Sequence, residues 1–323
     1  MARGHRPEAR LRRVLVLGAH GFFGRHALRL LRADGIAAVA VTRADVDVED
    51  AASVRALIHV NDVVLDTIGP FQTRSTALLD VALERGADLV DLSDSAEYAR
   101  VIAGRRNEIS ARGIAVLTGC SAISAVVATL IRASAVGDPV RVDAWLAPAS
   151  RETANVATAR SLLASLRSVE LHPCDFAPTR GMRVESALAI QLPAIWPALA
   201  EAAFWVDPHT RGAIPLLAVA TRSAVARRTL GALAPVGVRI ARLAGTREGI
   251  FAVRVEGASA VARWVLRAPT GSYLLALGPP TIAVRRLAMA ERGPRGLIPA
   301  DEQVSADMLF AYLERHGIGV ARI

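Results

Sequence analysis

The sequence contains no lysine, because all 39 of the residues counted together as Lys or Arg are arginines. An arginine side chain effectively never loses its proton, whereas a buried lysine can. The absence excludes catalysis through a lysine Schiff base or a lysine proton donor. It also excludes the lysine-dependent phosphate loop of Walker-type nucleotide-binding proteins.

Cysteine is almost as scarce. The chain has two, Cys120 and Cys174, which form no closely spaced pair. This usage is typical of a reducing compartment and argues against a disulfide framework. Because the sequence also lacks CxxC and HExxH motifs and its histidines are scattered, we expect no metal site.

Long apolar runs are missing as well. The longest weakly polar stretches, 122–131 and 213–220, fall far short of the ~20 apolar residues that span a bilayer. The run 14–18 is too short for the hydrophobic part of a signal peptide. We therefore expect a cytoplasmic protein without a transmembrane segment.

Aromatic residues make up only 4% of the chain, although its net charge is +9. A nucleic-acid-binding surface interleaves basic residues with stacking aromatics, and the sequence has no such stripe. We therefore expect no nucleic-acid partner, and we interpret residues 1–13 as a flexible basic tail. The composition leaves peripheral membrane contact and homodimerisation open.

The sequence does contain a glycine loop between a strand and a helix. Residues 14–17 form the apolar run of a buried strand, and residues 25–32 show helical apolar spacing. Between them, Gly18 permits a tight turn, Gly21 lets the backbone approach a pyrophosphate, and Gly24 lets the helix pack closely. The N–H groups at the start of the helix would then face the phosphates. The predicted dinucleotide site also includes His20, Phe22 and Phe23.

The end of the second predicted strand, 37–42, indicates which dinucleotide binds. A carboxylate there bonds the ribose of NAD, whereas an arginine accommodates the 2′-phosphate of NADP. The residue in place is Arg43, with Asp45 two positions further on. We therefore expect NADP, with NAD left open because Asp45 is close, and we expect Asp47 to contact the adenine.

Strands and helices then alternate up to about residue 135. Predicted strands at 62–68, 89–92 and 114–117 are each followed by a helix, as in a parallel sheet covered on both faces. The link after the second strand is too short for a crossover, so the usual third strand is either short or missing. Gly-Pro directly after a strand makes a rigid turn at the carboxyl edge, where ligands bind. The predicted cofactor site therefore also includes Thr67, Gly69, Pro70 and Phe71.

Four of these segments, 14–24, 67–71, 89–94 and 118–121, together resemble the saccharopine dehydrogenase-like NAD(P)-binding oxidoreductases. That family shows a glycine loop, a Gly-Pro-Phe/Tyr segment, a Val-Asp-Leu-x-Asp segment and a Ser-Gly-Ala-Ser segment in this order. The resemblance implies an NAD(P)-binding Rossmann domain followed by an α+β domain that covers the nicotinamide. Saccharopine dehydrogenases proper use a Lys/His pair, so the absence of lysine argues against saccharopine as the substrate.

We therefore predict an α/β protein with a Rossmann doubly wound parallel sheet in residues 14–136 and a second α+β domain in residues 137–270. Residues 271–323 are predicted to be a C-terminal helical segment, with packing back on the Rossmann domain left open. In the second domain we expect strands at 140–147, 183–191 and 250–256, and helices at 153–168, 192–205 and 216–233.

No catalytic acid–base pair is evident from the sequence. Location at the carboxyl edge favours Asp94, Cys120 and Ser121. Each also has a plain structural explanation, as a helix cap, a small buried apolar residue and the end of a strand. We predict an NADP-dependent oxidoreductase for a small carbonyl, imine or enoyl substrate. The alternative is a non-catalytic dinucleotide-binding protein that senses redox state or regulates a partner.

Overall fold

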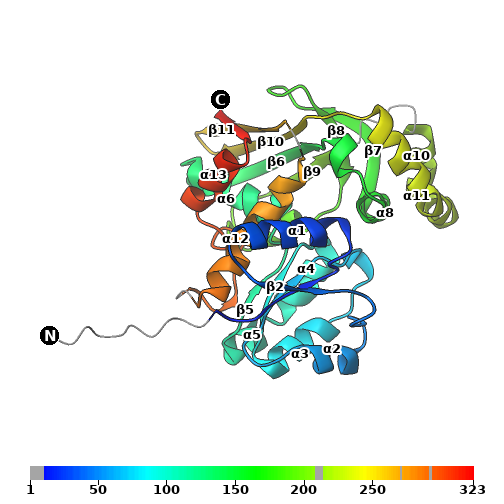
Figure 1. Ribbon diagram of the computed structural model, residues 1–323. Helices are drawn as coiled ribbons and strands as arrows, with labels where there is room; N and C mark the ends of the chain where they lie inside the picture. Colours follow the sequence, from blue (N-terminus) through cyan, green and yellow to red (C-terminus); the bar gives the residue numbers. More distant parts are fainter. Residues whose placement is uncertain (1–10, 208–213, 270, 291–292) are drawn as a thin grey trace.

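The computed structural model describes residues 11–207, 214–269, 271–290 and 293–323, which form two sheets flanked by helices (Figure 1). The first sheet has six parallel strands in the order β12-β5-β4-β3-β1-β2. These strands are β1 (Val14–Leu17), β2 (Ala38–Val41), β3 (Val63–Asp66), β4 (Asp88–Asp91), β5 (Ala115–Leu117) and β12 (Gly296–Leu297). The helices between β1 and β5 are α1 (Phe22–Ala33), α2 (Ala51–Leu57), the 3-10 turn η1 (Phe71–Thr73), α3 (Ala77–Arg85), α4 (Ala96–Gly104) and α5 (Arg106–Arg112). After β5, the π-helical turn η2 (Ala122–Val126) and α6 (Val127–Ala133) lead to the second sheet.

The second sheet has seven strands in the order β13-β11-β10-β6-β9-β8-β7 and is mixed, because β6 and β9 pair in parallel while the other pairs are antiparallel. Its strands are β6 (Pro139–Ala147), β7 (Leu166–Pro173), β8 (Arg180–Val184), β9 (Glu201–Val206), β10 (Gly249–Gly257), β11 (Val261–Ala268) and β13 (Gly319–Arg322). The remaining helices are α7 (Ser150–Thr153), α8 (Val156–Ser165), α9 (Leu188–Gln191), α10 (Ile214–Arg222), α11 (Ala224–Ala244), α12 (Tyr273–Ala288) and α13 (Ala306–Arg315).

The first sheet is buried on both faces, which explains the continuous apolar runs of its strands. Val14 and Val16 of β1 pack in one core with residues of α1 and α12. Leu15 and Leu17 pack in another core with residues of α2, α3, α4 and α5. The fold is therefore the predicted α/β class, a Rossmann-type parallel sheet followed by a second sheet with its own helices.

The third strand of a standard doubly wound sheet is missing from the described residues. β1 pairs with β2 on one side and with β3 on the other, and α2 is the crossover that leads from β2 to β3. This is one of the two arrangements that the short link after β2 left open. β2 is consequently the edge strand of the sheet. Residues 42–50, which follow it, form a loop.

The C-terminal segment contributes to both sheets. Helix α12 contacts α1, β3 and β4, and β12 adds a strand beside β5 at the edge of the first sheet. The last strand, β13, instead pairs with β11 in the second sheet. Neither β12 nor β13 was expected in a helical segment, because each is too short or too polar to form a recognisable apolar run.

Three expectations for the second domain are wrong. Residues 183–191 are not one strand, because β8 ends at Val184 and α9 follows; residues 192–205 are not a helix, because β9 begins at Glu201. Short apolar runs do not distinguish a strand from a buried helix. The helix expected at 216–233 is two helices, divided at Ser223, whose hydroxyl accepts a hydrogen bond from the N–H of Ala226 at 3.3 Å.

The flexible tail was predicted to comprise residues 1–13, but Arg12 and Arg13 are held in place by ion pairs. Residues 1–10 of that tail lie outside the described residues. Arg12 forms an ion pair with Asp88 at 2.5 Å, and Arg13 forms one with Asp62 at 2.5 Å. Both carboxylates are buried and need a cationic partner, so they hold this part of the chain against the amino ends of β4 and β3.

A buried ion pair lies beneath the carboxyl end of β3. The side chain of Asp66 is fully buried, forms an ion pair with Arg74, and accepts a hydrogen bond from the N–H of Ile68 at 2.9 Å. Burial raises the pKa of Asp66 despite the attraction of Arg74. Arg74 is itself almost fully buried, and Asp66 together with Glu49 at 3.5 Å compensates its charge.

Replacing Arg74 with Met should lower the free energy of unfolding at pH 7 by about 3–5 kcal/mol, because an uncompensated carboxylate would remain buried. Urea denaturation measures the loss. The matched control is Arg55→Met, which breaks the half-exposed pair with Glu84 and should cost less than about 1 kcal/mol. Equal losses in the two variants would show that Asp66 does not depend on Arg74.

Candidate functional site

The glycine loop follows β1 and is packed more tightly than any side chain would allow. Gly18 has a φ of +77°, in the left-handed region that favours glycine, and a Cβ there would lie 2.9 Å from Cγ1 of Ile68. A Cβ on Gly24 would lie 2.2 Å from the carbonyl oxygen of Gly18. A Cβ on Gly21 would lie 3.0 Å from the same oxygen. The three glycines therefore let the first turn of α1 pack directly on the loop.

The amino end of α1 offers unpaired N–H groups. Its first position outside the helix is Gly21, which supplies no capping side chain, and the first turn contains no acidic residue. A helix end of this kind normally has a Ser, Thr, Asp or Asn cap. Without one, the N–H groups of Phe22 and Phe23 and the positive end of the helix dipole are left for an anion.

Asp45 and Arg43, the two residues expected to decide between NAD and NADP, differ in their contacts in the loop after β2. Asp45 turns back on Thr42, whose N–H and hydroxyl both donate to one carboxylate oxygen at 2.7 Å. These bonds lower the pKa of Asp45. Arg43 is exposed, and no carboxylate among the described residues pairs with it. Asp47 is exposed as well and accepts a hydrogen bond from the N–H of Glu49 at 3.0 Å.

The segment after β3 supports the glycine loop from the side. The hydroxyl of Thr67 donates to the carbonyl oxygen of Leu17 at 2.6 Å, so this side chain joins β3 to the start of the loop. Gly69 is half-buried and Pro70 is exposed. Phe71 is buried against Tyr98, with ring centroids 5.5 Å apart. The expected cofactor residue Phe71 is thus a core residue.

An aromatic cluster that the sequence did not suggest lies beside the loop. The ring of Tyr273, at the start of α12, is 5.6 Å from Phe22 and 3.9 Å from His26, and Phe22 is 5.3 Å from Phe23. Burial, with the nearby charges of Arg29 and Arg25, lowers the pKa of His26. Tyr273 is far from the loop along the chain, and no local pattern announces the contact.

Asp94 lies in a polar cluster between the two sheets. One carboxylate oxygen accepts from the hydroxyl of Ser161 at 2.6 Å, and the other accepts from Nε2 of Gln72 at 3.2 Å. Nε2 of Gln72 also lies within hydrogen-bonding distance of Ser161 (2.9 Å) and Ser165 (3.0 Å). Burial raises the pKa of Asp94. Ser161 and Ser165 are four residues apart and share one face of α8, but no sequence pattern linked them to Asp94.

The other two catalytic candidates, Cys120 and Ser121, are more deeply buried than Asp94. Cys120 is fully buried, and burial beside Asp91 raises the pKa of its thiol well above the usual value, so a thiolate is disfavoured. Ser121 is buried at the end of the loop after β5. Asp94 is also not the helix cap that the sequence suggested, because the hydroxyl of Ser95 accepts from the N–H of Tyr98 at 3.2 Å.

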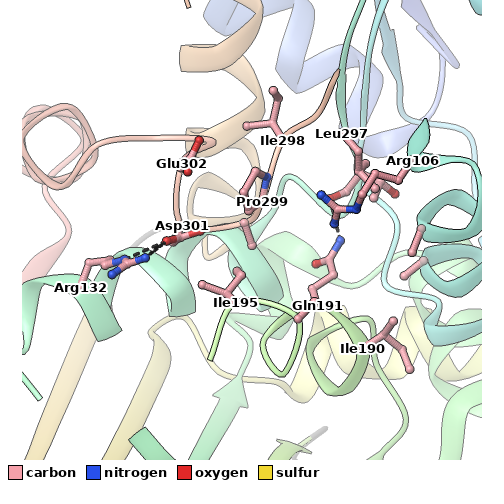
Figure 2. A pocket seen from close by; sticks show the side chains of 15 residues that line it. Arg106, Arg132, Ile190, Gln191, Ile195, Leu297, Ile298, Pro299, Asp301 and Glu302 are labelled. Carbon is pink, nitrogen blue, oxygen red and sulfur yellow. Dashed lines mark hydrogen bonds and ion pairs between the residues drawn. The ribbon is translucent and has the colours of Figure 1, made fainter. Parts of the chain in front are cut away.

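A cavity of about 160 Å³ lies at the other edge of the first sheet from β2, between α4, α9 and the segment 297–302 (Figure 2). Arg132 and Asp301 form an ion pair on one side, and Nε2 of Gln191 donates to the carbonyl oxygen of Thr118 at 2.9 Å on the other. None of the predicted cofactor or catalytic residues lines this cavity. The cavity and the glycine loop are therefore separate features.

No group of three or more His, Cys, Asp or Glu side chains among the described residues could hold a metal ion. No helix within that part of the chain is long and apolar enough to cross a membrane.

No protein-family model and no curated protein sequence matches the chain, so the resemblance to the saccharopine dehydrogenase-like family stays a prediction. Among solved structures, the chain is similar to GenD2 from gentamicin A biosynthesis in complex with NAD, with 13% identity, a TM-score of 0.46, and coverage of 100% of this chain and 99% of that chain. It is also similar to UDP-N-acetylglucosamine 3-dehydrogenase GnnA from Acidithiobacillus ferrooxidans, with 12% identity, a TM-score of 0.41, and coverage of 95% and 97%. Similarity at this level does not indicate the ligand or the reaction of this chain.

Asp91, at the end of β4, is a fully buried carboxylate without a cation. Its Oδ1 accepts from the N–H groups of Ser93 (2.9 Å) and Gly119 (2.8 Å), whereas its Oδ2 has no hydrogen-bond partner. Burial raises its pKa to about 6. The folded protein therefore binds this proton more tightly than the unfolded chain, so the ionised Asp91 lowers stability at neutral pH.

We expect Asp91→Asn to raise the free energy of unfolding by about 2 kcal/mol at pH 7.5. The gain should shrink as the pH falls from about 6 towards the ordinary pKa of 3.8, and it should vanish only below about pH 3, where Asp91 is protonated in both states. Asp88→Asn is the control, because Asp88 pairs with Arg12 and Arg295 and its replacement should destabilise at pH 7.5. Denaturant titrations across this pH range measure both variants, and a pH-independent effect of Asp91→Asn would contradict the assignment.

Proposed function

We propose that the chain binds a nicotinamide dinucleotide across the carboxyl edge of the first sheet and acts as an NAD(P)-dependent oxidoreductase. The observation that carries the proposal is the glycine loop, in which Gly24 leaves no room for a Cβ and Gly21 leaves the helix uncapped. Such a loop fits a pyrophosphate, whose charge would meet the N–H groups of Phe22 and Phe23. When bound, the cofactor supplies or accepts a hydride.

NADPH is the preferred form under this proposal. The 2′-phosphate of its ribose would lie near the end of β2, where Arg43 is exposed and has no carboxylate partner in the described chain. Asp45, the residue that would favour NADH, already accepts two hydrogen bonds from Thr42. Its carboxylate would have to give up both bonds to reach a ribose hydroxyl.

Asp94 is the residue that we assign to proton transfer. It lies at the carboxyl edge, it is only partly exposed, and burial raises its pKa, which favours the protonated form. Ser161 and Gln72 orient its carboxyl group. In this role Asp94 would give a proton to the oxygen, nitrogen or carbon atom of a small carbonyl, imine or enoyl substrate.

A second candidate function is dinucleotide binding without catalysis, as in a redox sensor or a regulatory protein. The burial of Cys120 favours it, because one of the three catalytic candidates is thereby unreactive. The bonds that Ser161 and Gln72 make to Asp94 are also compatible with a purely structural carboxylate that joins the two sheets.

Changing Arg43 to Gln should weaken NADPH binding by about tenfold, because the 2′-phosphate loses its charge-assisted partner. NADH affinity should change by less than about twofold. Isothermal titration calorimetry with both coenzymes measures the difference. The control is Gly21→Val, which places a side chain in the pyrophosphate cradle and should abolish binding of both; equal losses of the two coenzymes in Arg43→Gln would refute the 2′-phosphate assignment.

Deuterium transfer separates the two candidate functions. With 4-deuterated NADPH and a panel of small carbonyl, imine and enoyl compounds, we expect label in one product, and Asp94→Asn should lower that rate by at least about a hundredfold. The rate should fall as the pH rises through the raised pKa of Asp94, since the protonated form is the donor. NADPH binding without transfer to any compound would favour the non-catalytic function.

A further inference from the structure

Helix α11 presents a long face that no described part of the chain covers. Figure 1 shows the helix at the outer edge of the molecule, beside α8 and α10. Its inner side is marked by Ala234 and Val238, which are buried. At 21 residues and 1.5 Å per residue, the helix is about 30 Å long.

The uncovered face is mainly apolar, with Thr229 as an exposed polar residue within it. Successive residues of an α-helix are separated by 100°, which places five exposed residues on the side opposite Ala234. These residues form the apolar stripe, and 54% to 73% of each is exposed: Val225, Leu233, Val236, Ile240 and Leu243. Val219 of the neighbouring α10 is 54% exposed as well. A contiguous apolar surface of this kind is typical of an interaction site, unlike scattered single residues.

Arginines run along one border of the apolar stripe. Arg228, Arg239 and Arg242 are exposed and lie on the same side of α11, between the stripe and the buried face. The whole stretch from 208 to 247 contains no Asp or Glu. It contains seven arginines, namely Arg211, Arg222, Arg227, Arg228, Arg239, Arg242 and Arg247. All charged residues of α11 itself are therefore positive.

This combination selects among the surfaces that could cover α11. A second copy of the chain would bring its own arginines against these, and like charges in contact oppose association. A nucleic acid would pair with the arginines but would leave the apolar stripe in water. An anionic lipid surface satisfies both features, because it offers negative headgroups above an apolar acyl layer.

We propose that α11 docks the protein on an anionic phospholipid membrane. The helix lies parallel to the surface, with the apolar stripe at the acyl boundary and the arginine border against the headgroup phosphates. No helix of the described residues spans a bilayer, so the contact is peripheral. The inference is independent of the dinucleotide site, which lies on the first sheet.

The test is co-sedimentation of the full chain with vesicles of phosphatidylcholine alone or with 30 mol% phosphatidylglycerol. We expect binding to the anionic vesicles only, weakened by 0.5 M salt. The triple variant Val236→Gln/Ile240→Gln/Leu243→Gln should bind at least about tenfold more weakly. The double variant Arg228→Gln/Arg239→Gln should bind about thirtyfold more weakly at low salt.

Matched controls change the same residue types elsewhere on the surface. Val39→Gln/Val60→Gln/Val261→Gln removes three exposed valines, and Arg29→Gln/Arg32→Gln removes two exposed arginines of α1. Both should bind like the unaltered chain, and melting curves check the fold of every variant. Failure to bind anionic vesicles, or equal binding by the α11 variants, would overturn the proposal. A dimer in sedimentation equilibrium that the triple variant abolishes would assign the face to a second copy instead.

Discussion

The carboxyl edge of the first domain depends on one close approach, between Gly24 in the first turn of α1 and the carbonyl oxygen of Gly18. A Cβ at position 24 would lie 2.2 Å from that oxygen, so only glycine lets the helix begin there. The approach also fixes where the uncapped N–H groups of α1 point. Thr67 holds the loop from the other side through Leu17, so the geometry is shared by β1, α1 and β3.

The two sheets are joined by residues from distant parts of the chain. Helix α12 returns to cover one face of the first sheet, and β12 extends its edge beside β5. Between the sheets, Asp94 and Gln72 of the first domain meet Ser161 and Ser165 of α8. These hydrogen bonds tie α8 to the segments that follow β3 and β4 of the first sheet.

The part of the first domain that lies within residues 14–136 was predictable from sequence because its features are local. Strand β1, the three glycines and the start of α1 lie within residues 14–33, and the buried strands appear as apolar runs. The predictions that were wrong concern features that depend on tertiary contacts. The residues of α9 and β9 are similarly apolar, and only their packing decides between helix and strand. Tyr273 beside Phe22 and the lone buried carboxylate of Asp91 likewise follow from the fold and not from spacing.

The absence of lysine shapes how the protein handles charge. Arginine keeps its proton even when buried, so Arg74 remains a cation beside Asp66 in the interior. Proton exchange near neutral pH is then left to histidines and to carboxyl groups with raised pKa values. Three aspartates of the described residues have such values, Asp66, Asp91 and Asp94. Asp66 and Asp91 are closed off from solvent, whereas Asp94 is partly exposed, and this difference is why we propose Asp94 for proton transfer.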